Sequence, residues 1–593
     1  MAPLDAASPA TLAGLPLEAL MPGLDALPPD QAIAAYRAWL AANPASPQRF
    51  AAWFNLGALL SGAGDRATAL VAYRQALALK PDLHQATVNL GLTLEAEGRA
   101  EEALALWRDA VQPDAARTAL LNHRGRLLES RKEYAAAEQV LHASLLTDPR
   151  QPDVIQHWAH LRQKACLWPL QGNGIPGLSA EALALQGGPL GALALTDDPA
   201  LQRRIGEGWI ARKVASAPER LAPARGYAHD RIRLGYLSSD FCRHAMGFLI
   251  VELLERHDRS RFEVFGYCST PEDGSDLRRR IITALDHHVP IGHLSEEDAA
   301  RRIRADEIDI LIDLNGLTAG ARLGALRWKP APVQVTYLGY VGPVPLPELD
   351  WMICDDVTVP ADQAAHYAPR PLPLEGCYQA NDGRIQALPV VTRATEGLPD
   401  DAFLLCCFNN FYKITPDVFA AWMAILHAVP RAVLWLTEDN ATGIVNLRQQ
   451  AMAAGVAAER LIFASRCEPQ HYLARLGIAD LFLDTFPYNA GTVASDALRM
   501  GLPIITLAGR AFASRMAASL LTAVGATDGI TTTRDDYVAR AIEIATDPAR
   551  HAAARTALRG DAWRRGLGDT AGFAARMEAA YDSICLRPSS GTA

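Results

Sequence analysis

The amino-acid sequence predicts an array of paired α-helices followed by an α/β unit with two lobes. Small residues recur at intervals of 34 positions in the N-terminal third of the chain. From Arg231 onward, short apolar runs alternate with amphipathic segments instead. Because 593 residues are too many for one hydrophobic core, several domains are expected.

The 34-residue spacing is typical of tetratricopeptide (TPR) repeats, in which each unit is a pair of helices. Small residues let the two helices approach each other, and larger residues fill the groove between units. The sets that keep this register are Gly57, Gly91 and Gly125, then Ala69, Ala103 and Ala137, then Tyr73, Trp107 and Leu141. We therefore expect a TPR superhelix with a capping helix over residues 28–168, followed by a connector over residues 169–229.

The rest of the chain predicts two parallel, doubly wound sheets, because helical segments separate its apolar runs. Residues 230–385 are expected to form an N-terminal Rossmann-like lobe, and residues 386–585 a C-terminal Rossmann-like, nucleotide-binding lobe, with a cleft between them. Ligands in such sheets bind at the carboxyl ends of strands, so residues that follow strands are candidate site residues. The predicted strands are Ile232–Ser238, Phe262–Tyr267, Ile308–Leu314, Val333–Leu338 and Trp351–Cys354, then Phe403–Phe408, Val433–Leu436, Leu461–Phe463, Leu481–Leu483 and Ile504–Leu507.

Composition and charge argue against several classes of protein. A formal charge of −9 disfavours nucleic acid or an anionic membrane as partner, since both normally require a basic surface. The nine cysteines are scattered and show no zinc-site spacing. The N-terminus lacks the pattern of a signal peptide, and no apolar stretch is long enough to span a bilayer. We expect a soluble, cytoplasmic protein without a metal or cofactor.

Two candidate segments follow strands of the first lobe. His244 comes after the strand Ile232–Ser238 and directly before an apolar helix, so it would lie in the cleft near a helix N-terminus. It would serve there as a base or hydrogen-bonding group, or else only cap the helix. Asn315 lies in a Gly-rich turn after another strand, where its amide is able to bind hydroxyl or phosphate oxygens. An ordinary strand-to-helix turn is also rich in Gly.

Lys413 follows the first strand of the second lobe, next to Asn410 and Tyr412. An ammonium at a strand end is placed to neutralise a diphosphate leaving group. A lone Lys in a loop is more often only a solvated charge. The neighbouring Asn and Tyr favour the functional interpretation.

The run from Ala479 to Leu498 carries the most information. A buried strand gives way to a loop of small residues that includes Gly491, and a helix begins near Thr492. Backbone N–H groups at a helix start form a natural phosphate site. Asp496, one turn into the helix, is placed to accept hydrogen bonds from ribose hydroxyls. The chain has no GxxxxGKS loop and no GxGxxG after its first strand, which argues against NTP hydrolysis and against a nicotinamide dehydrogenase.

Together, the repeats and the segments around His244, Asn315, Lys413 and Asp496 resemble the O-GlcNAc transferase family (glycosyltransferase family 41), including its bacterial members with few repeats and the SPINDLY-like proteins. The resemblance covers roughly residues 30 to 560. The segments that carry it are RIRLGYLSSDF, FEVFGYCSTPEDGS, ALRWKPAPVQVTYLGY, CCFNNFYKI, VLWL, ADLFLDTFPYNAGTVASDAL and ASRMAASLL.

The resemblance implies a GT-B fold and an inverting, metal-independent enzyme. Such an enzyme moves GlcNAc from UDP-GlcNAc to Ser or Thr hydroxyls of a protein held by the TPR array. His244 matches the cleft histidine once proposed as base, and Lys413 matches the lysine on the donor diphosphate. The other positions that the resemblance assigns to the donor are Asn410 beside that lysine, Arg475 beside the nucleotide base, Thr492 in the diphosphate loop and Asp496 on the ribose.

Three segments depart from the family pattern. The family usually has His-Pro-Thr where this chain has His244-Ala245-Met246, and His-Thr-Thr where it has Gly491-Thr492-Val493. A Pro-Gly-Thr-Ser segment that lines the sugar pocket is replaced by Val341–Pro347. Each lost buried hydrogen bond is worth about 1 kcal/mol or more. The resemblance therefore carries over to the nucleotide and the reaction more directly than to the sugar.

Two other functions are compatible with the sequence. A flagellin glycosyltransferase pairs a TPR array with the same kind of catalytic unit, and would take flagellin as acceptor and a CMP-nonulosonic acid or another donor. A CMP donor has one phosphate, which fits the altered Gly491–Val493 loop. The third function is a non-catalytic TPR scaffold that binds only a sugar nucleotide or a partner. The presence of His244, Lys413 and Asp496 argues against it.

Overall fold

A computed structural model describes residues 15–24, 27–110, 114–170, 174–217, 219–384 and 387–586. The chain divides into two compact units. The first comprises Met1–Leu161 with Gly174–Leu178, and the second comprises Arg162–Asn173 with Ser179–Ala593. The predicted boundary between the two lobes, at residues 385 and 386, lies outside the described residues.

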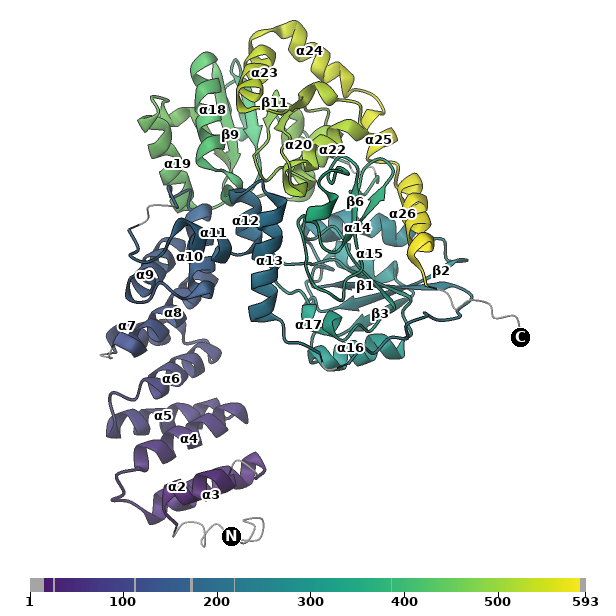
Figure 1. The fold of residues 1–593 in the computed structure, drawn as a ribbon. Helices are drawn as coiled ribbons and strands as arrows, with labels where there is room; N and C mark the ends of the chain where they lie inside the picture. Colours follow the sequence, from purple (N-terminus) through teal and green to yellow (C-terminus); the bar gives the residue numbers. More distant parts are fainter. Residues whose placement is uncertain are drawn as a thin grey trace, which may run out of the picture. The chain divides into compact units, whose positions relative to one another are not determined.

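The first unit consists of consecutive pairs of α-helices (purple to blue in Figure 1). Small and large residues that share the 34-residue register lie in contact, but within one helix pair rather than in the groove between units. A Cβ atom on Gly91 would lie 2.2 Å from the Trp107 indole, and one on Gly57 would lie 2.8 Å from the Tyr73 ring. Only Gly permits so close an approach of the partner helix. The helices are α2 (Leu17–Leu24), α3 (Pro29–Ala42), α4 (Arg49–Gly62), α5 (Arg66–Leu79), α6 (His84–Ala96), α7 (Ala100–Asp109), α8 (Asp114–Ser130), α9 (Tyr134–Thr147) and α10 (Pro152–Lys164), whose last residues belong to the second unit.

Three helices precede the first sheet of the second unit: α11 (Ala180–Gln186), α12 (Pro189–Leu195) and α13 (Pro199–Lys213). This segment contacts both lobes. The Tyr340 hydroxyl of the first lobe donates to the Pro189 carbonyl oxygen at 3.1 Å. The Asp197 carboxylate accepts hydrogen bonds from the backbone N–H groups of Arg510 at 2.8 Å and Ala511 at 2.9 Å, in the second lobe.

The first lobe contains a seven-stranded parallel sheet in the order β3-β2-β1-β4-β5-β6-β7. All five predicted strands are present. The two edge strands β3 and β7 were not predicted, because their HHVP and RPLPL sequences interrupt the apolar pattern with His and Pro. The elements are β1 (Ile232–Ser238), α14 (Ala245–Arg256), β2 (Phe262–Cys268), α15 (Asp276–Thr283), β3 (His287–Pro290), α16 (Glu296–Ala305), β4 (Ile310–Asp313), α17 (Leu323–Arg327), β5 (Val333–Thr336), β6 (Trp351–Asp355) and β7 (Arg370–Leu374).

The second lobe contains a six-stranded parallel sheet in the order β10-β9-β8-β11-β12-β13. Its five predicted strands are also confirmed, and the two-residue β13 is too short to predict. The elements are β8 (Phe403–Cys407), α18 (Pro416–Ala428), β9 (Ala432–Thr437), α19 (Ala441–Ala453), β10 (Leu461–Ala464), α20 (Pro469–Ile478), β11 (Leu481–Leu483), α21 (Thr492–Arg499), β12 (Ile504–Leu507), α22 (Met516–Ala523), β13 (Ile530–Thr531), α23 (Arg534–Thr546), α24 (Pro548–Ala557), α25 (Ala562–Gly566) and α26 (Thr570–Ile584).

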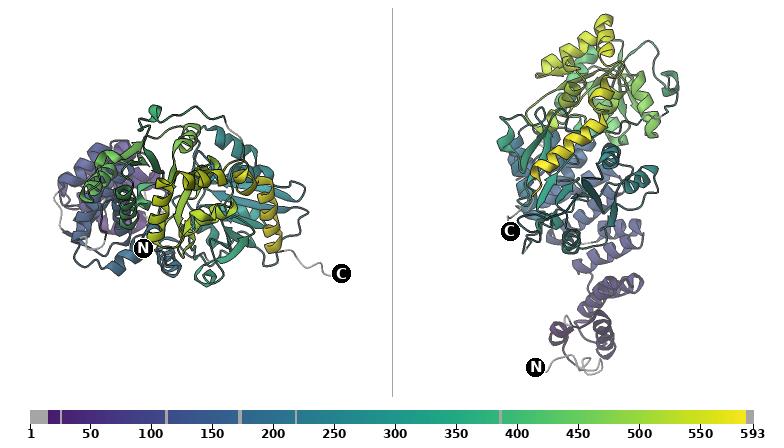
Figure 2. Two further views of the ribbon diagram at one scale, coloured as in Figure 1. Left: turned by 90° about the horizontal axis from the view of Figure 1, so that it is seen from above. Right: turned by 90° about the vertical axis from the view of Figure 1, so that its right-hand side faces the viewer.

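The chain passes from the first lobe to the second near Gly383, which we call the first crossing, and returns near Gly568, the second crossing. The two crossings are in contact. A Cβ atom on Gly383 would lie 2.8 Å from the carbonyl oxygen of Gly568. After the second crossing, α26 packs on the first lobe (yellow in Figure 2). Glu578 of α26 lies 3.1 Å from His257 Nδ1. The two-lobed GT-B architecture that the sequence predicts is therefore confirmed.

Candidate functional site

The candidate residues gather where the strand order of each sheet reverses. In the first sheet β1 lies between β2 and β4, and in the second β8 lies between β9 and β11. Ligands of doubly wound sheets bind at such switch points. The candidates that follow β1, β4, β8 and β11 are His244, Asn315, Asn410, Tyr412, Lys413, Gly491, Thr492 and Asp496.

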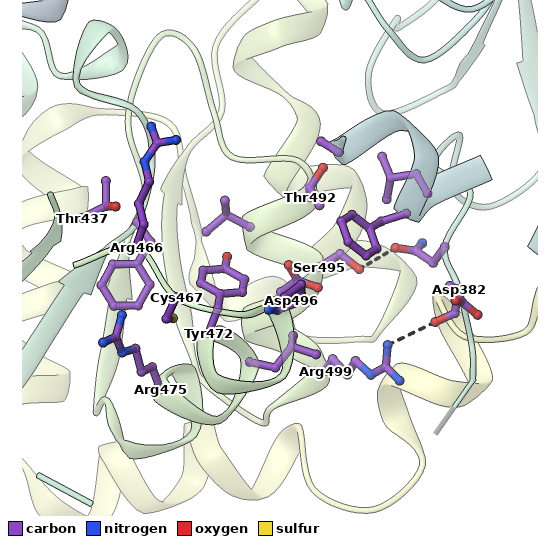
Figure 3. A pocket seen from close by; sticks show the side chains of 18 of the residues that line it. Asp382, Thr437, Arg466, Cys467, Tyr472, Arg475, Thr492, Ser495, Asp496 and Arg499 are labelled. Atoms are coloured by element: carbon purple, nitrogen blue, oxygen red, sulfur yellow. Dashed lines mark hydrogen bonds between the residues drawn. The ribbon is translucent and has the colours of Figure 1, made fainter. Parts of the chain in front are cut away.

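A cavity of about 420 Å³ lies at this position, with walls from both lobes (Figure 3). Helix α14 of the first lobe contributes Ala245, Phe248 and Leu249, and the first crossing contributes Asn381 and Asp382. The second lobe supplies the rest of the wall. The sequence-predicted residues that line the cavity are Arg475, Thr492 and Asp496.

The loop from β11 to α21 is organised by the buried carboxylate of Asp484. One carboxylate oxygen accepts hydrogen bonds from the N–H groups of Thr485 and Ala490, each at 2.8 Å. The other accepts from the Thr506 hydroxyl at 2.7 Å. Burial nevertheless raises the pKa of Asp484 to about 6. These bonds fix the turn that leads into α21.

Helix α21 begins at the cavity with unpaired backbone groups. Gly491 is its N-cap residue and offers no side-chain cap. The N–H groups of Thr492 and Val493 have no hydrogen-bond partner among the described residues. A helix start of this kind attracts an anion, because its N–H groups carry a partial positive charge.

Asp496 lies one turn further along α21 and faces the cavity (Figure 3). Within the described ranges, its carboxylate forms neither a hydrogen bond nor an ion pair. Burial raises the pKa of Asp496 to about 7, and the positive charge of Arg499 opposes the increase. An unpaired carboxylate in a cavity wall is suited to accept hydrogen bonds from ligand hydroxyls.

The Lys413 side chain is buried beside the same loop rather than solvated. Its Nζ atom donates to the Asn489 carbonyl oxygen at 2.9 Å and lies 3.6 Å from the centre of the Tyr488 ring. Burial lowers the pKa of Lys413 to about 8, and the nearby charge of Asp484 opposes the decrease. An ammonium has three donors, so it retains N–H capacity for a ligand.

The other second-lobe candidates have different surroundings. Asn410 is exposed, and Tyr412 packs edge-on against Tyr488 with 6.0 Å between ring centres. Arg475 lies in α20, where its Nε atom is 2.6 Å from a Glu396 carboxylate oxygen. This ion pair fixes the guanidinium in the cavity wall.

His244 is the N-cap residue of α14, and more than half of its side chain is exposed. Its Nδ1 atom accepts the N–H of Met246 at 3.3 Å. A ring that accepts at Nδ1 in its neutral form carries its proton at Nε2. The helix-capping role is thus present, and His244 is not among the residues that line the cavity.

Asn315 stabilises the loop between β1 and α14, which carries His244, through hydrogen bonds. Its amide nitrogen donates to Ser239 Oγ and to Asp240 Oδ2, both at 2.8 Å. Its amide oxygen accepts the Ser239 N–H at 2.9 Å. The amide is therefore engaged within the protein, and the structure does not present it to a ligand as the sequence analysis expected.

Several lining residues were missed by the sequence analysis. Thr437 ends β9, and Ser465 and Cys467 follow β10, so the strand-end rule already applied would have found them. Tyr472 of α20 and Trp563 of α25 carry no such signal, because helix packing alone brings them to the cavity.

Two of the segments that depart from the family pattern differ in their surroundings. Gly491 is closely surrounded: a Cβ atom there would lie 2.5 Å from Met516 Cε and 3.2 Å from Gln379 Oε1. The segment Val341–Pro347 is not among the residues that line this cavity. It packs on the helices before the first sheet instead, with Pro345 against Gly206.

Two findings concern the described residues as a whole. They contain no cluster of three or more His, Cys, Asp or Glu side chains with the geometry of a metal site. None of their helices combines the length and the apolar character needed to cross a membrane.

Comparisons with known proteins identify the family of the chain. Glycosyl transferase family 41 matches residues 213–374 and 376–577. The chain is 32% identical over 410 residues to the probable UDP-N-acetylglucosamine–peptide N-acetylglucosaminyltransferase SEC of Arabidopsis thaliana, covering 66% of this chain and 42% of the relative. It is 30% identical over 361 residues to another probable UDP-N-acetylglucosamine–peptide N-acetylglucosaminyltransferase of Arabidopsis thaliana, SPINDLY. This match covers 60% of this chain and 39% of the relative.

A solved structure of a mutant O-GlcNAc transferase from Thermobaculum terrenum matches with a TM-score of 0.62 and 25% identity, over 98% of both chains. The chain spans about two fifths of the length of the two plant relatives. Since the family match covers more than half of its residues, the chain belongs to glycosyl transferase family 41.

Proposed function

We propose that this chain is an inverting protein O-glycosyltransferase that moves GlcNAc from UDP-GlcNAc to Ser or Thr hydroxyls. One observation carries the proposal: the start of α21, the unpaired Asp496 carboxylate and the Lys413 ammonium meet at one switch point. A sugar nucleotide contains a ribose, which a carboxylate is suited to bind, and a diphosphate, which a helix start and an ammonium are suited to bind. The printed descriptions of the plant relatives and of the bacterial structure support the same donor and a peptide acceptor.

The nucleotide would occupy the 420 Å³ cavity. The Tyr472 ring offers a face to the base, and Asp496 accepts hydrogen bonds from the ribose hydroxyls. The diphosphate would lie against the N–H groups of Thr492 and Val493. Arg475, fixed by Glu396, forms part of the wall near the base.

In the reaction, the acceptor hydroxyl attacks C1 of the sugar from the face opposite the diphosphate, the C1–oxygen bond to UDP breaks, and the hydroxyl proton passes to water. Negative charge then develops on the departing diphosphate. Lys413 and the α21 N–H groups stabilise that charge, so the enzyme would need no metal ion. His244 would orient the acceptor or sugar through its Nε2–H group.

We also assign the acceptor to the TPR array and the protein to the cytoplasm, where sugar nucleotides are made. Flagellin is a candidate acceptor. A CMP-linked donor is the second candidate, because Gly491 leaves the diphosphate loop without the imidazole that the family usually carries. The position of Lys413 beside that loop favours a diphosphate donor.

A donor panel tests the proposal on the full chain. Melting temperatures would be measured with UDP-GlcNAc, UDP-GalNAc, UDP-Glc, GDP-fucose and a CMP-nonulosonate, followed by transfer of the labelled sugar to candidate acceptor proteins. At a hundred times Kd, a bound donor stabilises the protein by about 2.7 kcal/mol. Stabilisation and transfer with UDP-GlcNAc, retained in excess EDTA, support the proposal. A response to the CMP donor alone replaces it with the second candidate, and binding without transfer indicates a scaffold.

A further inference from the structure

The ammonium of Lys413 is buried and contacts two neighbouring residues of one loop. Only 9% of the residue is exposed. Its Nζ atom lies 3.6 Å from the centre of the Tyr488 ring and 2.9 Å from the carbonyl oxygen of Asn489. Within the described part of the chain, no carboxylate lies at ion-pair distance from Lys413. The Tyr488 ring face is therefore its nearest source of negative electrostatic potential besides that carbonyl.

Two titratable groups face Lys413 from the sheet, Asp484 at the end of β11 and Cys407 at the end of β8. Asp484 is occupied by hydrogen bonds from Thr485, Ala490 and Thr506. Cys407 is a buried thiol whose pKa is raised by burial, so it remains uncharged near neutral pH. Neither group contacts the ammonium directly, whereas the aromatic ring does.

The Tyr488 ring is itself held in place. Its backbone carbonyl accepts the Thr485 hydroxyl at 2.6 Å. Its ring packs edge-on against the Tyr412 ring, with 6.0 Å between the ring centres. The backbone bond and this ring contact hold the Tyr488 face against the ammonium.

We propose that Tyr488 is a positioning residue whose ring face keeps the Lys413 ammonium charged and in place beside the start of α21. A cation over the face of an aromatic ring is attracted by the ring quadrupole, most strongly when both are desolvated. The consequence for leaving-group stabilisation rests on the proposed function. The effect on the Lys413 charge does not.

The chain contains six lysines, Lys80, Lys132, Lys164, Lys213, Lys329 and Lys413, so the ammonium can be titrated directly. The full chain would be labelled with lysine carrying ¹³C at Cε, and Lys413→Arg would assign the Lys413 signal by its disappearance. The methylene protons of Lys413 are expected upfield of the other five, because they lie over a ring. Their absence from the upfield region overturns the proposal without any Tyr488 variant.

The matched pair Tyr488→Phe and Tyr488→Leu then separates the ring from the hydroxyl. The Lys413 titration midpoint should stay within a few tenths of a pH unit in the Phe variant, and fall by about one unit in the Leu variant. Equal midpoints in the wild type and the Leu variant contradict the proposal. If the Leu variant does not fold, the test rests on the upfield shift of the Lys413 methylene protons. The shift must be present in the wild type and retained in the Phe variant, and its absence from either contradicts the proposal.

A second readout links the residue to the reaction. In the Leu variant, the pH at which kcat declines should fall together with the Lys413 midpoint, while the KM for the acceptor stays unchanged. A wild-type chain that transfers no sugar from any donor would refute the proposed function alone. The titration would still decide the role of Tyr488.

Discussion

The Asp484 carboxylate accepts a hydrogen bond from the Ala490 N–H at 2.8 Å, and so closes the turn from Asp484 to Ala490 that carries Tyr488 and Asn489. The turn positions both groups that contact the Lys413 ammonium. A single buried carboxylate thus shapes the loop, although it does not itself line the cavity.

Replacing Asp484 by Ala should destabilise the protein and disorganise the loop. The substitution leaves the N–H groups of Thr485 and Ala490 without an acceptor, and each such buried group costs about 1–3 kcal/mol. We expect a loss of about 3 kcal/mol in urea unfolding followed by tryptophan fluorescence. The exposed Asp401 gives a control, and equal stability of the two Ala variants would contradict the role of Asp484.

Lys413→Ala should abolish most of the transfer. Removing one preorganised charge-stabilising donor typically costs about 10²–10³ in kcat. Because burial lowers the pKa of Lys413 to about 8, wild-type kcat should also decline as the pH rises through 8. The control is Lys132→Ala at an exposed position. Transfer that survives in Lys413→Ala would remove this residue from the mechanism.

Asp496 should make donor binding depend on pH near neutrality. Burial raises its pKa to about 7, so the carboxylate loses its charge as the pH falls through that value. If the ribose is bound by the ionised form, the Kd for UDP-GlcNAc should increase about tenfold between pH 8 and pH 6. Calorimetry at several pH values measures this. In Asp496→Asn the profile should be flat, and a wild-type profile equally flat would contradict the assignment.

The sequence was sufficient for the architecture because its signals were local. Apolar runs predicted ten strands. The 34-residue spacing of small residues predicted the helix pairs, and Gly57 and Gly91 each face a large side chain in the structure. The edge strands β3 and β7 were not predicted, because half-exposed edge strands tolerate His and Pro, which interrupt the apolar pattern. In the site, the strand-end rule located the loops but not the direction of each side chain. It could not show that Asn315 turns toward Ser239, or that Lys413 is buried against Tyr488.

Cys467 provides a reporter of cavity occupancy. It is exposed and lines the cavity, whereas six of the other eight cysteines are buried. Partial burial raises its pKa, so labelling by N-ethylmaleimide should accelerate as the pH increases toward 9. UDP at a hundred times Kd should slow labelling about a hundredfold. Cys467→Ser controls for the other thiols, and labelling that UDP does not slow would place the nucleotide elsewhere.

Gly91 should tolerate Ala far less well than Gly62, although both lie in helices of the repeat array. A Cβ atom on Gly91 would lie 2.2 Å from the Trp107 indole, while one on Gly62 would meet nothing within 4 Å. Overpacking of this kind costs about 1–3 kcal/mol, and a rigid indole has little room to move. Gly62→Ala instead gains about 0.5 kcal/mol from reduced backbone entropy in the unfolded chain.

Hydrogen exchange of the α6–α7 peptides in the full chain measures the difference. Faster exchange in Gly91→Ala, with no change in peptides from the second unit, would place the defect at this helix pair. Equal exchange in the two variants would mean that the 34-residue register does not set the packing of the array.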